Sequence, residues 1–150
     1  TLVSAEEAGL RSDGFHSALV PEAADQITWR IGDSGFDMTL SGFVPLTLAR
    51  ALPEHALAIL GGLAPEEIAL WAVHPGGRSV VDAVGHGIGI PEPALAHSRA
   101  VLREHGNMSS ATVMFVLARM LAAAPAPGTR GCALAFGPGL SAESMRFTVA

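Results

Sequence analysis

The amino-acid sequence predicts a layered α/β domain in which strands are packed by helices. Two apolar runs, residues 68–73 and 132–136, are typical of strands buried on both faces. Segments with helical periodicity lie between them, and strands interleaved with helices form a layered α/β domain. A chain of 150 residues has the length of one domain and can bury a sizeable core. We therefore expect one domain over residues 1–150.

The composition indicates a packed globular chain that is unusually apolar. Hydrophobic residues make up 49% of the sequence and charged residues only 15%. Either another domain or subunit covers part of the apolar surface, or the composition reflects a preference for alanine, and both explanations can hold. The net charge of −5 argues against nucleic-acid binding, because no basic patch is present to neutralise phosphates.

Targeting and redox features favour the cytoplasm. The single cysteine, Cys132, cannot form an internal disulfide, which fits a reducing compartment. The sequence shows no secretory signal, and no apolar run reaches the roughly 18 residues that span a bilayer. We expect a cytoplasmic protein with no membrane contact. Because Thr1 begins what reads as running domain sequence, we also expect a fragment of a longer protein.

The first forty residues carry strand patterns. Residues 15–20 form the first predicted strand, which Pro21 ends. Two stretches then alternate apolar and polar residues, and the turn composition of residues 32–35 separates them. This arrangement predicts a β-hairpin. The alternating apolar residues are Ile27, Trp29, Ile31, Phe36, Met38 and Leu40.

Helical patterns lie on either side of the first buried strand. A helix over residues 45–60 is kinked or divided at Pro53, and the glycines at 61–62 end it. After the strand, residues 78–85 form a short helix. The glycine-rich residues 85–89 follow a helix and do not open one, so they predict a turn and not a nucleotide-binding loop.

The second half of the chain contains two further helices and two strands. Residues 92–104 form an amphipathic helix. Residues 111–122 are apolar nearly all round, so this helix must be buried. The buried strand at 132–136 leads through a tight turn at 137–139 to a last alternating strand at 145–149.

A histidine stands at the end of the first buried strand. His74 directly follows residues 68–73. Pro75 prevents the strand from continuing, and Gly76 and Gly77 let the backbone turn. Side chains at the carboxyl end of a buried strand in an α/β sheet face the crevice where ligands bind. The sequence therefore places His74 in a candidate site.

An asparagine stands just before the apolar helix. Either Ser109 or Ser110 could cap that helix, which puts Asn107 near a helix N-terminus, where the backbone dipole favours negative charge. Taken alone, a histidine after a strand is more often a packing residue, and an asparagine is more often a turn former. A histidine and an amide donor that converge on one crevice suit the stabilisation of an oxyanion or enolate.

Three motifs, taken in order, resemble a known enzyme family. They are His74-Pro75-Gly76-Gly77, Gly106-Asn107-Met108-Ser109-Ser110-Ala111 and Ala135-Phe136-Gly137-Pro138-Gly139. They are similar to the C-terminal half of type III polyketide synthases, the chalcone synthase-like branch of the thiolase fold, and the resemblance covers essentially the whole chain. It implies a thiolase-like layered fold for residues 1–150, with a mixed sheet packed by helices. It also implies a homodimer, and an absent N-terminal half that carries the nucleophilic cysteine.

The resemblance implies a decarboxylative Claisen condensation of malonyl-CoA onto an acyl-CoA starter, giving a resorcinol, a pyrone or a small aromatic polyketide. His74 and Asn107 would donate hydrogen bonds to the thioester carbonyl of the malonyl unit. His74 would also hold the nucleophilic cysteine as a thiolate. CoA thioesters enter as substrates, and neither a cofactor nor a metal is implied. Cys132 lies in a buried strand with nothing to lower its pKa, so we expect an inert core residue.

The resemblance also assigns binding residues. The positions that match those beside coenzyme A are Gly76, Gly77 and Ser79, and the positions that line or brace the cavity are Ser109, Phe136, Gly137 and Pro138. Met38 stands where plant members carry a gatekeeping phenylalanine, and Trp29 stands where they often have glycine. The glycines could instead be turn formers, and the two large side chains could simply pack a strand face.

Two other functions are compatible with parts of the sequence. A ketoacyl synthase of fatty-acid initiation also uses cysteine, histidine and asparagine, but the sequences around His74 and Asn107 differ from those of that enzyme. The chain could also be a non-catalytic interaction half that keeps only the fold. A cysteine in a buried strand-to-helix setting upstream would favour an enzyme, and its absence would favour the non-catalytic half.

Overall fold

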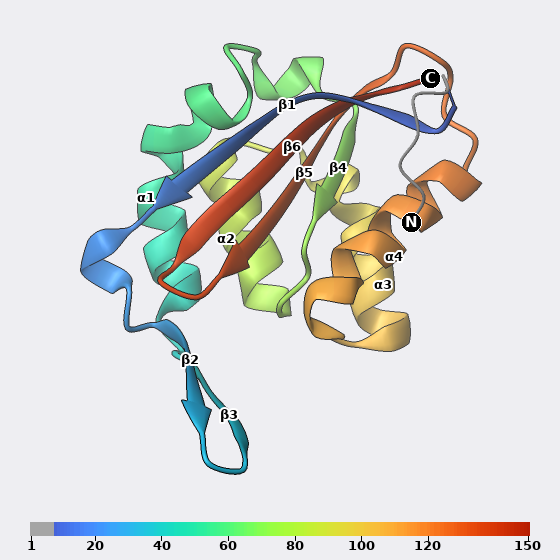
Figure 1. Cartoon of the computed structure of the whole chain (residues 1–150). Coiled ribbons are helices and arrows are strands. Elements are labelled where there is room, and N and C mark those ends of the chain that lie inside the picture. Colours follow the sequence, from blue (N-terminus) through green and yellow to red (C-terminus); the bar gives the residue numbers. More distant parts are fainter. Residues whose placement is uncertain (1–7) are drawn as a thin grey trace.

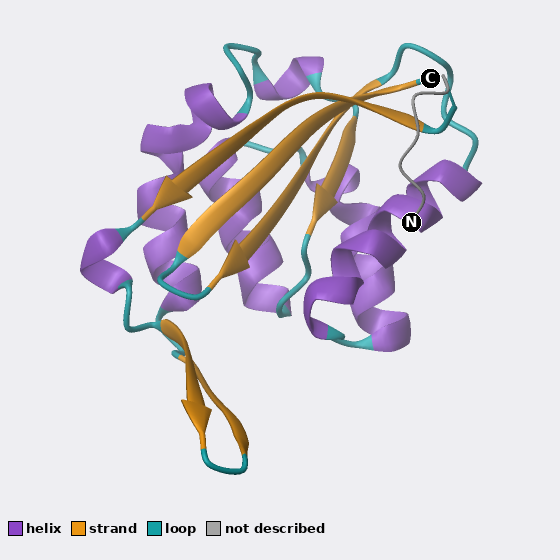
Figure 2. Ribbon diagram, viewed as in Figure 1, coloured by secondary structure: helices purple, strands orange, loops and turns teal. Residues whose placement is uncertain are grey.

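The computed structural model describes residues 8–150, which form one four-stranded sheet with helices and one separate hairpin (Figure 2). The strands are β1 (Leu10–Leu19), β2 (Ile27–Gly32), β3 (Gly35–Leu40), β4 (Leu70–Val73), β5 (Arg130–Gly137) and β6 (Ser141–Val149). The α-helices are α1 (Val44–Ile59), α2 (Arg78–Ile88), α3 (Ala96–His105) and α4 (Thr112–Ala122). Short 3-10 turns are η1 (Pro21–Ala23), η2 (Pro65–Glu67), η3 (Glu92–Leu95) and η4 (Ser109–Ala111).

The sheet is mixed and has the strand order β1-β6-β5-β4 (Figure 1). Strand β4 pairs parallel with β5, whereas β6 pairs antiparallel with both β5 and β1. A parallel pair needs a crossover connection, and the chain between β4 and β5 supplies helices α2, α3 and α4. The predicted α/β class with a mixed sheet packed by helices is confirmed.

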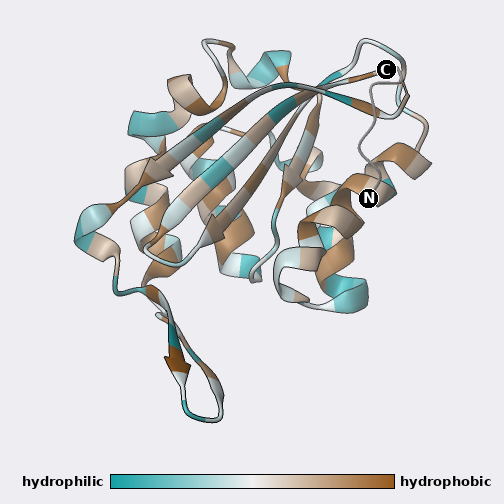
Figure 3. Ribbon diagram, in the orientation of Figure 1, coloured by the Kyte–Doolittle hydropathy of each residue, from teal (hydrophilic) through white to brown (hydrophobic). Residues whose placement is uncertain are grey.

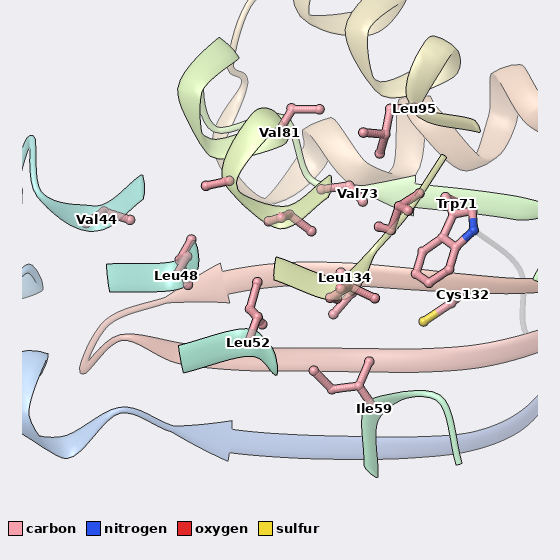
Figure 4. Packing of buried hydrophobic residues seen from close by; sticks show 14 of the residues in the cluster. Val44, Leu48, Leu52, Ile59, Trp71, Val73, Val81, Leu95, Cys132 and Leu134 are labelled. Carbon is pink, nitrogen blue, oxygen red and sulfur yellow. The ribbon is translucent and has the colours of Figure 1, made fainter. Parts of the chain in front are cut away.

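Helices cover both faces of this sheet. Successive side chains of a strand point to opposite faces. In β4, Trp71 and Val73 pack into a core with α1 and α2, whereas Ala72 packs into a second core with α3 and α4. Figure 4 shows Trp71 and Val73 among the apolar side chains of the first core. The strand is therefore buried on both faces, as its apolar run predicts.

Helix α1 remains one helix through Pro53. A proline inside a helix removes one backbone hydrogen bond, but it does not interrupt the buried stripe of Leu48, Leu52 and Ile59. These side chains are spaced at helical intervals and pack against the sheet on both sides of the proline. The expected stop at Gly61 and Gly62 is confirmed, since both have positive φ angles of 63° and 85°.

The prediction that α2 ends at Gly85 in a glycine-rich turn is wrong. The helix continues to Ile88 and ends at Gly89, which has a φ of 81°. A Cβ on Gly85 would lie 2.9 Å from Leu95 Cδ1, and a Cβ on Gly87 would lie 3.1 Å from Leu52 Cβ. Both glycines therefore allow α2 to pack closely against its neighbours, a tertiary cause that local composition does not show.

Two other helix predictions need correction. The expected helix over residues 92–104 divides into η3 and α3, although Leu95 and Val101 are buried as predicted. Helix α4 was expected to be buried all round, but within residues 8–150 nothing covers its outer face. Met114 and Phe115 of that face are 39% and 45% exposed. The apolar composition of α4 therefore leaves an apolar surface on this chain.

The β2–β3 hairpin projects from the end of the main sheet (Figure 1). Its register pairs Trp29 with Met38 and Ile31 with Phe36, so the apolar side chains share one face and the polar side chains share the other. Ile31 is 87% exposed, and Figure 3 shows hydrophobic residues continuing along the hairpin away from the body.

No helix among residues 8–150 has the length and apolar character needed to cross a membrane.

Candidate active site

A cavity of about 470 Å³ opens at the edge of the sheet where β4 and β5 end. Its walls come from the hairpin, the β4–α2 loop, the start of α4 and the β5–β6 turn. Most residues assigned to the site from sequence line it, namely Trp29, Met38, His74, Gly76, Asn107, Ser109, Phe136, Gly137 and Pro138. The remaining walls include apolar side chains, so the cavity favours a ligand with apolar parts.

His74 is positioned by the backbone of the sheet. Its N–H donates to the carbonyl of Leu134 at 2.7 Å, which continues the β4–β5 pairing one residue beyond β4. Burial lowers the pKa of His74 below its ordinary value, because a charged imidazolium loses hydration there. The imidazole is therefore neutral at pH 7, with one N–H to donate and one nitrogen to accept.

Asn107 is positioned by hydrogen bonds of its own amide. The side-chain Nδ2 donates to the carbonyl of Gly76 at 3.0 Å, and Oδ1 accepts from the N–H of Ser109 at 2.9 Å. The N–H of Gly76 in turn donates to the carbonyl of His74 at 3.0 Å. Gly76 thus links the two loops, and the second Nδ2 hydrogen of Asn107 remains for a ligand.

The expected capping of α4 by Ser109 or Ser110 is wrong. Neither serine makes a side-chain cap bond, and η4 precedes α4. Instead, the side chain of Thr112, the first residue of α4, accepts from the N–H of Met108 at 2.8 Å. Sequence reasoning missed Thr112, although a hydroxyl in an otherwise apolar helix was the signal that could have found it.

Gly77 and Ser79 do not line the cavity. Gly77 stands in extended conformation just before α2, and Ser79 is exposed in the first turn of that helix. Gly77 directly follows Gly76, which lines the cavity, and Ser79 stands two residues after Gly77. Their assignment to coenzyme A stays a prediction.

Trp29 and Met38 face the cavity as a cross-strand pair. Both side chains are more than half exposed, and the ring of Trp29 lies 5.6 Å from that of Phe36. They therefore form an open wall of the cavity and belong to no buried core. In this position both side chains can contact a bound ligand and limit the space open to it.

Cys132 lies away from the cavity. It is fully buried in β5 opposite Trp71 of β4. Figure 4 shows both among the side chains of the core that includes residues of α1 and α2. Burial raises the pKa of the thiol to about 12. A thiol with that pKa is not a nucleophile at neutral pH.

Residues 8–150 contain no cluster of side chains that could hold a metal ion.

The arrangement offers two neutral hydrogen-bond donors to one cavity. His74 and Asn107 come from different loops and are joined through Gly76. Hydrogen-bond donors aimed at one oxygen stabilise negative charge that develops on it, and most strongly where water is excluded. The site can therefore stabilise an enolate or an oxyanion, but the described residues bring no activated nucleophile to it.

Sequence comparison finds relatives over most of this chain. The family model for chalcone and stilbene synthases, C-terminal domain, matches residues 15–149. A 1,3,6,8-tetrahydroxynaphthalene synthase from Streptomyces peucetius subsp. caesius is 37% identical over 146 residues, which are 91% of this chain and 39% of that protein. The α-pyrone synthesis polyketide synthase-like Pks18 from Mycobacterium tuberculosis is 32% identical over 137 residues, covering 89% of this chain and 35% of that protein.

Solved structures show the same fold. The crystal structure of PKS-I from the brown alga Ectocarpus siliculosus matches 98% of this chain with a TM-score of 0.84 and 36% identity. The 1,3,6,8-tetrahydroxynaphthalene synthase of Streptomyces coelicolor A3(2), a bacterial type III polyketide synthase, matches 95% of it with a TM-score of 0.84 and 30% identity. The chain covers 41% of each of these two structures, so it spans about two fifths of the relatives it matches.

Proposed function

This chain belongs to the chalcone and stilbene synthase family as a C-terminal domain, and on that premise we propose that it contributes His74 and Asn107 to a polyketide synthase active site. The observation that carries the proposal is the convergence of these side chains on one cavity through Gly76. The reaction is decarboxylative Claisen condensation of malonyl-CoA onto an acyl-CoA starter. The family match favours this reaction over that of a ketoacyl synthase.

In the proposed mechanism His74 and Asn107 act on the thioester carbonyl of the malonyl unit. Loss of carbon dioxide leaves an electron pair that moves onto this carbonyl oxygen as an enolate. An N–H from the neutral imidazole and the free Nδ2 hydrogen of the amide both stabilise the developing charge. Removing one such donor typically slows a reaction by about 10²–10³-fold.

We place the nucleophilic cysteine in an N-terminal half of the same protein. Cys132 is buried and holds its proton at neutral pH, and the relatives are more than twice as long as the matched region. The exposed apolar residues of α4 and of the hairpin support a covering partner, because such surface is costly in water. A thiolate placed beside His74 would raise the pKa of the imidazole. In this proposal the assembled enzyme is a homodimer.

The remaining site residues bind or shape the substrates. Gly76 and Gly77 lie in the β4–α2 connection and Ser79 lies in the first turn of α2, where coenzyme A would approach. Trp29 and Met38 form the hairpin wall of the cavity and would limit the growing chain. Phe136 and Gly137 at the end of β5 line the rest of the cavity together with Pro138 and Ser109. No cofactor beyond the CoA thioester substrates is required.

The names of two relatives support the proposed product class. Two of them are a tetrahydroxynaphthalene synthase and an α-pyrone synthesis protein. We accordingly propose a resorcinol, a pyrone or a small aromatic polyketide as the product. We expect the cavity to differ in shape from that of plant members, because Trp29 and Met38 stand at positions where plant members have other side chains.

Mass analysis of reaction products tests the proposal. The full-length protein is supplied with malonyl-CoA and acyl-CoA starters of graded chain length. We expect products that each contain a starter and one or more two-carbon extensions, whereas the 150-residue chain alone forms none. Condensation by the isolated chain would contradict the proposed division of the active site. Absence of product from the full-length protein with every starter would contradict the activity itself.

A further inference from the structure

We infer that Thr112 is a positioning residue that sets the orientation of the Asn107 amide. The inference rests on the function proposed for Asn107. Thr112 is the first residue of α4 and is fully buried, and it is one of three buried polar residues within 8–150, with Ser98 and Ser144. A buried hydroxyl is costly unless it is hydrogen-bonded, so the contacts of this side chain indicate what it does.

The hydroxyl of Thr112 closes the turn that leads into α4. Its Oγ1 accepts from the N–H of Met108 at 2.8 Å and donates to the carbonyl of Ser109 at 2.8 Å. Oδ1 of Asn107 lies at 3.4 Å, at the long end of hydrogen-bond distances. The direct contact with Asn107 is therefore weak, and the two short bonds act on the backbone between the two residues.

Ser109 is the residue that transmits this effect. Its φ of 60° lies in the left-handed region, which is unfavourable for a residue with a side chain. The carbonyl of Ser109 is held by Thr112, while its N–H donates to Oδ1 of Asn107 at 2.9 Å. The strained turn thus depends on Thr112 and supplies the hydrogen bond that fixes Asn107.

This hydrogen bond decides which end of the amide faces the cavity. With Oδ1 held by Ser109, Nδ2 is directed to the carbonyl of Gly76 and to the cavity. Without the Thr112 hydroxyl, Ser109 can relax to a negative φ and its N–H leaves Oδ1. The amide can then rotate and present an oxygen, which repels an enolate instead of stabilising it.

Variants of Thr112 in the full-length enzyme test this inference. Thr112→Val keeps the shape of the side chain and removes the hydroxyl, whereas Thr112→Ser keeps the hydroxyl. We expect Thr112→Val to lower kcat for malonyl-CoA decarboxylation about tenfold with KM changed less than about twofold, and Thr112→Ser to retain most of the rate. We expect the same loss of kcat for Thr112→Ala, which serves as the test if Thr112→Val does not fold.

A double-mutant cycle with Asn107→Ala separates positioning from a general structural effect. Because Thr112 acts through Asn107, Thr112→Val should cause no further loss of kcat in the Asn107→Ala background. Independent losses that multiply, or a wild-type kcat for both Thr112→Val and Thr112→Ala, would overturn the inference. If Asn107→Ala itself leaves decarboxylation unchanged, the proposed function of Asn107 fails, and the positioning role of Thr112 fails with it.

Discussion

The loop that carries His74 and the loop that carries Asn107 meet at one cavity but are held by different parts of the chain. His74 is fixed through its backbone, which continues the pairing of β4, a strand whose last three residues are buried. Asn107 is fixed through its side chain, whose oxygen and nitrogen both have partners. Within residues 8–150 the imidazole of His74 has no such partner.

This difference fits two different proposed roles. A histidine held only by its backbone keeps both ring nitrogens available, which suits a residue that must meet a thiolate and a substrate carbonyl. An asparagine held at both ends of its amide is oriented before substrate arrives, which suits a donor to a single oxygen. The predictions below concern first the strand β4 that carries His74, then the charge of the His74 imidazole, and then the neighbouring strand β5.

Replacing Trp71 with alanine should give the largest loss of stability. Trp71 is fully buried in the strand that carries His74, and its Nε1 donates to the carbonyl of Ile68 at 2.9 Å. We expect the free energy of unfolding to fall by about 3–5 kcal/mol, measured by urea unfolding of the full-length protein. The matched control is Trp29→Ala, because Trp29 lines the cavity and belongs to neither buried core; its replacement should cost about 1 kcal/mol or less. Equal losses would contradict the account.

Lowering the pH should destabilise the protein through His74. Burial lowers the pKa of His74 in the folded state, so below the ordinary histidine pKa of about 6.5 the unfolded state binds a proton that the folded state does not. Stability from this residue is therefore present above about pH 6.5 and is lost as the pH falls towards the lowered pKa. The measurement uses the 150-residue chain, because in the full-length enzyme the proposed thiolate would raise the pKa of His74. The difference in unfolding free energy between this chain and its His74→Gln variant, measured at pH 7.5 and pH 5, should shrink at pH 5. A constant difference would contradict the burial of the imidazole.

Changes at Cys132 should have the smallest effect. The thiol has a pKa of about 12, so it should resist alkylation in the native protein at pH 8, as read by peptide mass mapping. Cys132→Ala should leave decarboxylation within about twofold of wild type and cost about 1 kcal/mol of stability. Loss of condensation in this variant with the fold intact would make Cys132 a participant in the chemistry.

The sequence predicted the features that depend on local pattern. Alternation and apolar runs located the hairpin, the buried strand before His74 and the strand around Cys132. The order of the three motifs placed His74 and Asn107 together, and the structure brings both to one cavity. These features depend on residues close in the chain or on motifs that a family shares.

The features that were missed depend on contacts between distant segments. Gly85 and Gly87 are helical because α2 packs closely on Leu95 and Leu52, whereas local composition suggested a turn. The outer face of α4 is exposed because the described residues include no layer over it. The role of Thr112 depends on the positive φ of Ser109, which single-residue preferences do not predict.

Release of carbon dioxide from malonyl-CoA tests the central claim most directly. The full-length enzyme is compared with its His74→Ala and Asn107→Ala variants, with KM recorded alongside kcat. If both side chains stabilise the same enolate, each variant should lose about 10²–10³-fold in kcat while KM changes little. A rate near that of the wild type in either variant would show that His74 and Asn107 do not form the proposed pair of donors.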